Sequence, residues 1–156
     1  MEILKSSRHS KITGDFGEAL VLCWLSKHGF ECARVDHTGI DIIARNPRTA
    51  ELMGISVKSR SRSTGTGGTF VSIPNENFAK ATAACDAFGC VPYFAVVVDA
   101  DDTIRTYLVS MEHLLEVHPM RKTTSAWSMH TRALEAYASD SAIKCFEFHT
   151  GTSCWW

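Results

Sequence analysis

The stretch that decides the fold is residues 39–62, which read Gly-Ile-Asp-Ile-Ile-Ala-Arg-Asn-Pro-Arg-Thr-Ala-Glu-Leu-Met-Gly-Ile-Ser-Val-Lys-Ser-Arg-Ser-Arg. Ile40–Arg45 and Gly54–Ser59 are short apolar runs rich in β-branched residues, and Asn46-Pro47-Arg48 between them is typical of a turn. This pattern predicts an antiparallel hairpin. We expect its turn to be centred near Arg48–Ala50.

Two charged side chains interrupt the apolar pattern of this hairpin. With the turn placed there, Asp41 comes close to Lys58 across the pair of strands. Side chains alternate along a strand, so Ser56 and Lys58 share a face. A buried charge is costly unless it is paired with an opposite charge or bound to a metal. The hairpin therefore predicts a polar site that contains Asp41 and Lys58.

The composition is that of an ordinary globular protein. The chain has 156 residues, of which 45% are hydrophobic and 21% charged, which predicts one domain over residues 1–156 with a sizeable core. No apolar run approaches the roughly 20 residues of a membrane span, and the first residues lack the apolar segment of a signal peptide. We therefore expect a cytoplasmic protein without membrane contacts. The six cysteines form no Cys-x-x-Cys pair, which favours reduced, buried thiols.

The distribution of charge says more than its total. The net charge of −1 does not by itself favour nucleic acid as a partner. Residues 1–62, however, carry ten Lys and Arg against seven Asp and Glu, a net of +3, whereas residues 63–156 carry six against ten, a net of −4. The basic excess therefore lies on the half of the chain that contains the hairpin.

A helix is predicted before the hairpin. Residues 5–11 are polar and basic and are expected to be loose, and the helix is expected to start near Thr13–Asp15 and to end near His28-Gly29. Glu18 borders the apolar face of this helix and allows two interpretations. It is either a capping glutamate, paired with Asp15 as the cap, or a carboxylate directed at the sheet.

The remaining pattern predicts an α/β fold. Strands are expected at residues 30–36, 70–73, 91–99, 103–110 and 143–149, and helices from 75 to 88, from 111 to 117 and from 126 to 139, with a polar loop at 119–125. The strand at 91–99 is apolar on both faces, which predicts a central position in the sheet.

The segment after Lys58 has the composition of a mobile loop. Residues 59–69 contain two arginines, several hydroxyl side chains and three glycines, which suit contacts with phosphate oxygens. The alternative is a loop that is merely solvated. We predict DNA contacts by Ser59, Arg60, Arg62 and Lys80. Lys80, on the second helix, faces solvent or reaches the charged end of the hairpin.

Three motifs occur in an order that resembles a known superfamily. They are Gly14-Asp-Phe-Gly-Glu18 on the first helix, Gly39-Ile-Asp41 at the start of one strand, and Ile55-Ser-Val-Lys58-Ser on the next. Over residues 13 to about 99 the sequence resembles the PD-(D/E)xK nuclease superfamily, with the restriction-endonuclease-like fold, and within it the Holliday-junction-resolvase-like branch. The resemblance implies a central mixed β-sheet flanked by helices, and a metal-dependent nuclease that hydrolyses DNA phosphodiester bonds.

The resemblance also implies roles for individual residues. Asp41, the backbone carbonyl of Val57 and Glu18 would be the ligands of Mg²⁺ or Mn²⁺, with Glu18 binding directly or through water. Lys58 would orient or deprotonate the attacking water and stabilise negative charge. Hard divalent ions prefer such oxygen ligands and activate water for phosphodiester hydrolysis. Because both strands of a duplex must be cut, a homodimer is also implied.

One position departs from the superfamily pattern. Ser56 stands where an acidic or amide residue is usual, and a neutral hydroxyl is a poor ligand for Mg²⁺. Glu76, near the start of the second helix, is a candidate for the missing acid.

Two other functions remain open for the chain. One is a catalytically inactive DNA-binding module, in which Asp41 and Lys58 form a structural ion pair. The other is an interaction protein that uses the acidic half of the chain and the terminal pair Trp155-Trp156.

Overall fold

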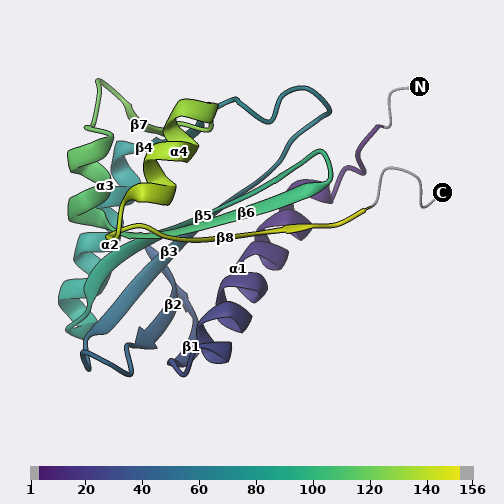
Figure 1. Cartoon of the computed structure of the whole chain (residues 1–156). Helices are drawn as coiled ribbons and strands as arrows, with labels where there is room; N and C mark the ends of the chain where they lie inside the picture. The colour runs from purple at the N-terminus through teal and green to yellow at the C-terminus, as the bar shows by residue number, and fades with distance from the viewer. Residues whose placement is uncertain (1–3, 152–156) are drawn as a thin grey trace.

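The structure is a computed structural model that describes residues 4–151. A six-stranded sheet lies between two layers of helices (Figure 1). The elements are, in order, α1 (His9–Lys27), β1 (Glu31–His37), β2 (Ile40–Arg45), β3 (Leu52–Ser61), β4 (Val71–Pro74), α2 (Asn75–Phe88), β5 (Val91–Ala100), β6 (Thr103–Ser110), α3 (Met111–Val117), β7 (Thr124–Trp127), α4 (Thr131–Ser139) and β8 (Lys144–His149).

The sheet is mixed, as the resemblance implied. Its strand order is β1-β2-β3-β5-β6-β8. Only β3 and β5 run parallel, and the other neighbours are antiparallel. The apolar strand β5 lies inside the sheet, as predicted from its composition, because both of its faces are covered. The prediction of a central mixed sheet flanked by helices is confirmed.

Two cores form on the two faces of the sheet. Helix α1 covers one face, where Val21 and Leu25 pack on Ile42, Ile55 and Val97. The other face is covered by α2, α3, α4 and the small β4–β7 sheet (Figure 1). Fully buried side chains with β-branched or aromatic shapes fill both cores, so the sheet is held by apolar burial on either side.

The N-terminal helix is longer than predicted. It begins at His9 rather than near Thr13–Asp15, so the expectation of a loose segment over residues 5–11 is wrong for its second half. Arg8 at the N-cap makes no side-chain capping bond, which explains why the sequence carries no start signal there. Lys11 and Asp15 form an ion pair one turn apart instead of Asp15 capping the helix.

The second half of the chain contains a strand that was not predicted. Thr124–Trp127 pairs with β4 as β7, so the polar loop is shorter than expected and the helix predicted over 126–139 is confined to α4. Trp127 is fully buried and stacks on Tyr137. Burial of this large side chain against β4 and α4 outweighs the helical pattern of the neighbouring residues.

The segment predicted as a loop is partly a strand. β3 continues to Ser61, and the connection that follows is held by the Arg62 guanidinium, which donates to the carbonyl of Phe70 at 2.9 Å. The backbone N–H of Gly65 donates to Asp101 across this connection. The expectation of a mobile loop is therefore wrong for residues 59–61.

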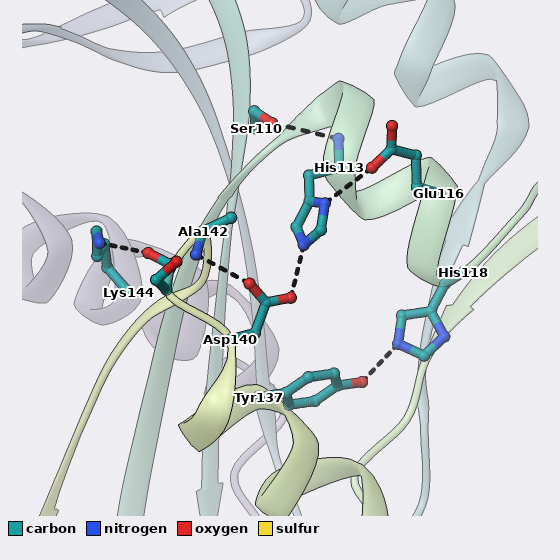
Figure 2. Close-up of polar contacts among 9 residues, drawn as sticks. Ser110, His113, Glu116, His118, Tyr137, Asp140, Ala142 and Lys144 are labelled. Atoms are coloured by element: carbon teal, nitrogen blue, oxygen red, sulfur yellow. Dashed lines mark hydrogen bonds and ion pairs between the residues drawn. The ribbon is translucent and has the colours of Figure 1, made fainter.

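Polar side chains join the short helices on the second face (Figure 2). The His113 ring lies between Asp140, with its Nε2 2.7 Å from the carboxylate, and Glu116, with its Nδ1 at 2.9 Å. Beside it the His118 ring contacts the Tyr137 hydroxyl at 2.5 Å. These contacts fix α3 against the end of α4.

In residues 4–151 no helix has both the length and the apolar character that a membrane span requires. Trp155 and Trp156, for which an interaction role was considered, lie outside the described residues.

Candidate active site

The turn of the β2–β3 hairpin lies within the range predicted from the sequence. Ile42 pairs with Ile55, so the turn is centred between Arg48 and Thr49. Extending this register by one residue puts Asp41 opposite Ser56 rather than opposite Lys58. The side chain of Asn46 accepts hydrogen bonds from the turn backbone and tightens the connection, which the sequence pattern alone did not reveal.

Asp41 continues the hairpin with its side chain. Its Oδ2 accepts a hydrogen bond from the backbone N–H of Val57 at 2.6 Å, just beyond the last β2–β3 pair. The N–H and C=O of one strand residue point toward the same neighbouring strand, so the carbonyl of Val57 faces the same open edge of β3. The edge where β2 ends therefore brings a carboxylate and a backbone carbonyl together.

Burial and charge act in opposite directions on the two central groups. Burial raises the pKa of Asp41, while the Val57 N–H and the Lys58 ammonium lower it. Burial lowers the pKa of Lys58, and Arg60 and Lys80 lower it further, while Asp41 raises it. Within the described residues Asp41 and Lys58 form no direct ion pair, although their charges act on each other.

Glu18 reaches the same place from helix α1. It lies in the interior of the helix and accepts a charge-assisted hydrogen bond from Arg34 of β1 at 2.5 Å. Its charge raises the pKa of Asp41, and that of Arg34 lowers it. The capping interpretation is wrong, because the helix begins at His9, and the carboxylate lies against strand β1, while its functional role stays a prediction.

Arg34 is a site residue that the sequence reasoning missed. It lies on edge strand β1 and pairs with Ile42, next to Asp41. The Glu18 carboxylate raises the pKa of its guanidinium. The signal was an arginine in the strand predicted beside the hairpin, but its partner depends on how α1 docks on β1.

The oxygen donors fit a small hard cation with few protein ligands. Two carboxylates, Asp41 and Glu18, and the Val57 carbonyl lie around the open edge of β3, and Mg²⁺ is commonly held by one or two carboxylates together with substrate phosphates. No cluster of three or more His, Cys, Asp or Glu able to hold a metal occurs in residues 4–151. Ser56 is buried, at 3% exposure, and Glu76 pairs with Lys80 at 3.2 Å.

The residues predicted to contact DNA are divided between two faces of β3. Ser59 faces α1, where its Oγ is enclosed beside Gly17. The guanidinium of Arg60 donates to the carbonyls of Ser59 and Ser72, and Arg62 bonds loop carbonyls as described above. Lys80 is exposed and close enough to lower the pKa of Lys58.

The sequence matches no protein-family model and no curated protein. The structure is similar to that of a Holliday junction resolvase of Archaeoglobus fulgidus, an archaeal hyperthermophile. The TM-score is 0.57 and the sequence identity 18%, over 79% of this chain and 88% of the resolvase. Given the strand order, the two helical layers and this likeness, the chain has the restriction-endonuclease-like fold that its sequence motifs predicted.

Proposed function

We propose that this protein is a metal-dependent nuclease that hydrolyses DNA phosphodiester bonds. The observation that carries the proposal is the Asp41 carboxylate, hydrogen-bonded to the Val57 N–H at the open edge of β3 and influenced by both Lys58 and Glu18. The likeness to a Holliday junction resolvase supports a DNA substrate. Buried, mutually perturbed titratable groups are typical of catalytic sites.

The metal would be held by this chain's oxygen donors. Asp41, Glu18 and the Val57 carbonyl are the candidate ligands of Mg²⁺ or Mn²⁺. When bound, such an ion activates water and neutralises charge on the phosphate. With only two carboxylates available, we expect weak binding of the ion until a DNA phosphate supplies further oxygens.

Lys58 and Arg34 support this chemistry in different ways. Burial lowers the pKa of Lys58, so this amine gives up a proton more readily than an exposed lysine and can accept one from the attacking water. In its charged form it stabilises the negative phosphate. Arg34 holds the Glu18 carboxylate in place through a bond of 2.5 Å and is a positioning residue.

The second candidate is a DNA-binding module without catalysis. Two observations favour it: Ser56 removes a charged ligand, and the charge of Glu18 is already balanced by Arg34. In that case Asp41 stabilises β3 through the Val57 N–H, and the cations Lys58, Arg60 and Lys80 bind phosphates.

The first experiment separates these functions. Purified protein is incubated with Mg²⁺ or Mn²⁺ and duplex, single-stranded, flapped and four-way DNA. Asp41→Ala and Lys58→Ala test the site, and Asp36→Ala, which removes an exposed acid from neighbouring strand β1, is the matched control. A nuclease requires cleavage by the parent and the control, and its loss in both site variants.

Other outcomes would identify the alternatives. Binding of DNA without cleavage by any metal would favour the inactive module, and absence of both would favour an interaction protein. If cleavage occurs, Glu18→Ala and Glu76→Ala would find any further acidic ligand. We also propose a homodimer, because cutting two strands needs two sites, and sedimentation velocity with and without DNA tests it.

A further inference from the structure

A polar cavity lies near the candidate active site, between the start of α1 and the end of β3. Its volume is about 380 Å³. Its lining consists of Lys5, Ser6, Ser7, His9, Ser10, Thr13, Ser59, Arg60 and Ser61. None of these nine residues is acidic, two are permanent cations and six carry hydroxyl groups. This chemistry suits an anion with several oxygens.

Within residues 4–151, two enclosed polar atoms at this cavity have no hydrogen-bond partner. They are Nε2 of His9 and Oγ of Ser59. Buried polar groups normally find a partner, and each exception calls for an explanation. Both residues line the cavity, so an oxyanion bound there is a candidate acceptor for hydrogen bonds from these two atoms.

Lys5 is held at the cavity by the backbone of β3. The Lys5 Nζ donates to the Ser61 carbonyl at 2.6 Å and lies 3.3 Å from its hydroxyl. The hydroxyl of Ser61 donates to Asp99 at 3.0 Å, so this neighbouring carboxylate already has a partner. Lys5 thus needs no large movement to meet an anion in the cavity.

The cavity is displaced from the candidate active site by the same amount along both elements. From Val57 to Ser59 and Ser61 the strand advances about 7 to 13 Å. From Glu18 back to Thr13 and His9 the helix recedes about 7 to 14 Å. A phosphate in the cavity and a phosphate at Asp41 would therefore belong to the same short stretch of DNA backbone.

We propose that this cavity binds a phosphate group of the DNA substrate, outside the phosphate that reacts. The proposal rests on the proposed function for the identity of the substrate, but not for the binding of phosphate itself. The cavity fixes the position of the DNA backbone along β3 and α1. Such contacts set the register of a protein on DNA without reading its sequence.

Binding of duplex DNA in EDTA tests this site without any cleavage. Lys5→Ala is compared with Lys11→Ala, which removes the same charge from an exposed lysine outside the cavity, paired with Asp15. We expect Lys5→Ala to reduce by about one the slope of log affinity against log salt concentration. Lys11→Ala should leave the slope unchanged. Equal slopes for both variants would overturn the proposal.

A spectroscopic measurement identifies the source of the phosphate. The imidazole signals of His9 are followed by NMR during titration with inorganic phosphate, and separately with duplex DNA lacking terminal phosphates. A shift with DNA assigns the site to a backbone phosphodiester, and a shift with inorganic phosphate alone assigns it to a free or terminal phosphate. Signals that move with neither ligand would contradict the site.

A third variant guards against an indirect effect. Ser10→Asp introduces a carboxylate into the cavity at the first turn of α1, where an acid is favourable to the helix. We expect it to abolish the His9 shift while the fold remains intact. Since none of these measurements uses metal or cleavage, a phosphate site without nuclease activity would refute only the proposed function.

Discussion

At the scale of single residues, two glycines of helix α1 differ in the space that surrounds them. Gly17 is buried, and a Cβ built on it would overlap the Ser59 side chain of β3. Gly14, one turn earlier, has nothing within 4 Å of such a Cβ. The first glycine lets α1 approach the strand that carries Lys58, and the second has no such role.

Alanine substitutions should therefore have opposite effects at these two positions. Gly17→Ala is expected to lower the free energy of unfolding by about 1–3 kcal/mol, because the new methyl group overpacks the α1–β3 contact. Gly14→Ala is expected to raise it by up to about 1 kcal/mol through helix propensity. Urea denaturation measures both, and the same sign for both variants would contradict the close packing at Gly17.

The ionised Asp41 carboxylate should destabilise the native state, because it is partly buried. Burial raises its pKa, so between the unfolded pKa of about 3.9 and the folded value the native state keeps a proton that the unfolded state has lost. Stability therefore falls as pH rises through this window. Asp41→Asn, which keeps an oxygen acceptor for the Val57 N–H, should be more stable than the parent above the window, with the difference shrinking toward pH 4.

Binding of a divalent metal ion should offset the loss of stability that the buried Asp41 carboxylate causes. Mg²⁺ or Mn²⁺ is expected to raise the thermal midpoint of the parent and to leave Asp41→Asn unchanged, since only a ligand that binds the native state stabilises it. Asp36→Asn, the same change at an exposed acid, should respond as the parent does. A parent without any shift at high metal concentration would favour the inactive DNA-binding module.

The sequence predicted the site residues that belong to local motifs, but not those that depend on contacts between distant elements. The motifs indicated Asp41, Lys58 and Glu18, and the structure brings their charges together. Arg34 was missed because its bond to Glu18 depends on the docking of α1 against β1. The position of the hairpin turn was predicted, but the exact pairing, with Asp41 opposite Ser56, depends on the turn that the Asn46 side chain shapes.

At the scale of elements, the network around His113 connects α3 to the end of α4 (Figure 2). Hydrogen bonds to Asp140 and Glu116 raise the pKa of His113, and the bond to His113 lowers the pKa of Asp140. The contribution of a raised histidine is fully present below its unfolded pKa of about 6.5 and is lost as pH rises through the folded value. The contribution of Asp140 is lost as pH falls below about 4.

Replacement of His113 should consequently have a pH-dependent cost. His113→Gln is expected to reduce the free energy of unfolding more at pH 5.5 than at pH 9, because the contribution of the parent histidine falls as pH rises through its raised pKa. His130→Gln, at an exposed histidine of the same region, should cost little at either pH. Chemical denaturation at both pH values measures the difference, and a cost independent of pH would mean that the ring acts only through packing.

Elements that form locally were predicted better than those that depend on distant partners. β5 and α2 follow from their own apolar patterns, and Gly89 ends α2 in the left-handed conformation that favours glycine. β7 exists only because it pairs with β4, 56 residues earlier by the register of Val71 with Trp127. A pattern within Thr124–Trp127 cannot reveal such a partner.

At the scale of the whole molecule, the basic and acidic residues lie on different elements of the fold. The cations that act on the candidate site come from β1, β3 and α2, whereas acidic residues populate the β5–β6 turn, α3, α4 and β8. With a net charge of −1 the protein has no general attraction for DNA, so affinity must arise from the cationic side alone.

One lysine substitution and one arginine substitution test this separation of charge. Lys80→Ala should weaken duplex binding and reduce the salt slope by about one, because its ion pair with Glu76 is exposed and yields readily to a phosphate. Arg132→Ala removes an exposed cation from α4, on the acidic side, and should change neither affinity nor slope. Fluorescence anisotropy over a range of salt concentrations measures both. Equal losses would mean that DNA contacts α4 as strongly as α2, which is incompatible with a substrate path confined to the cationic elements around β3.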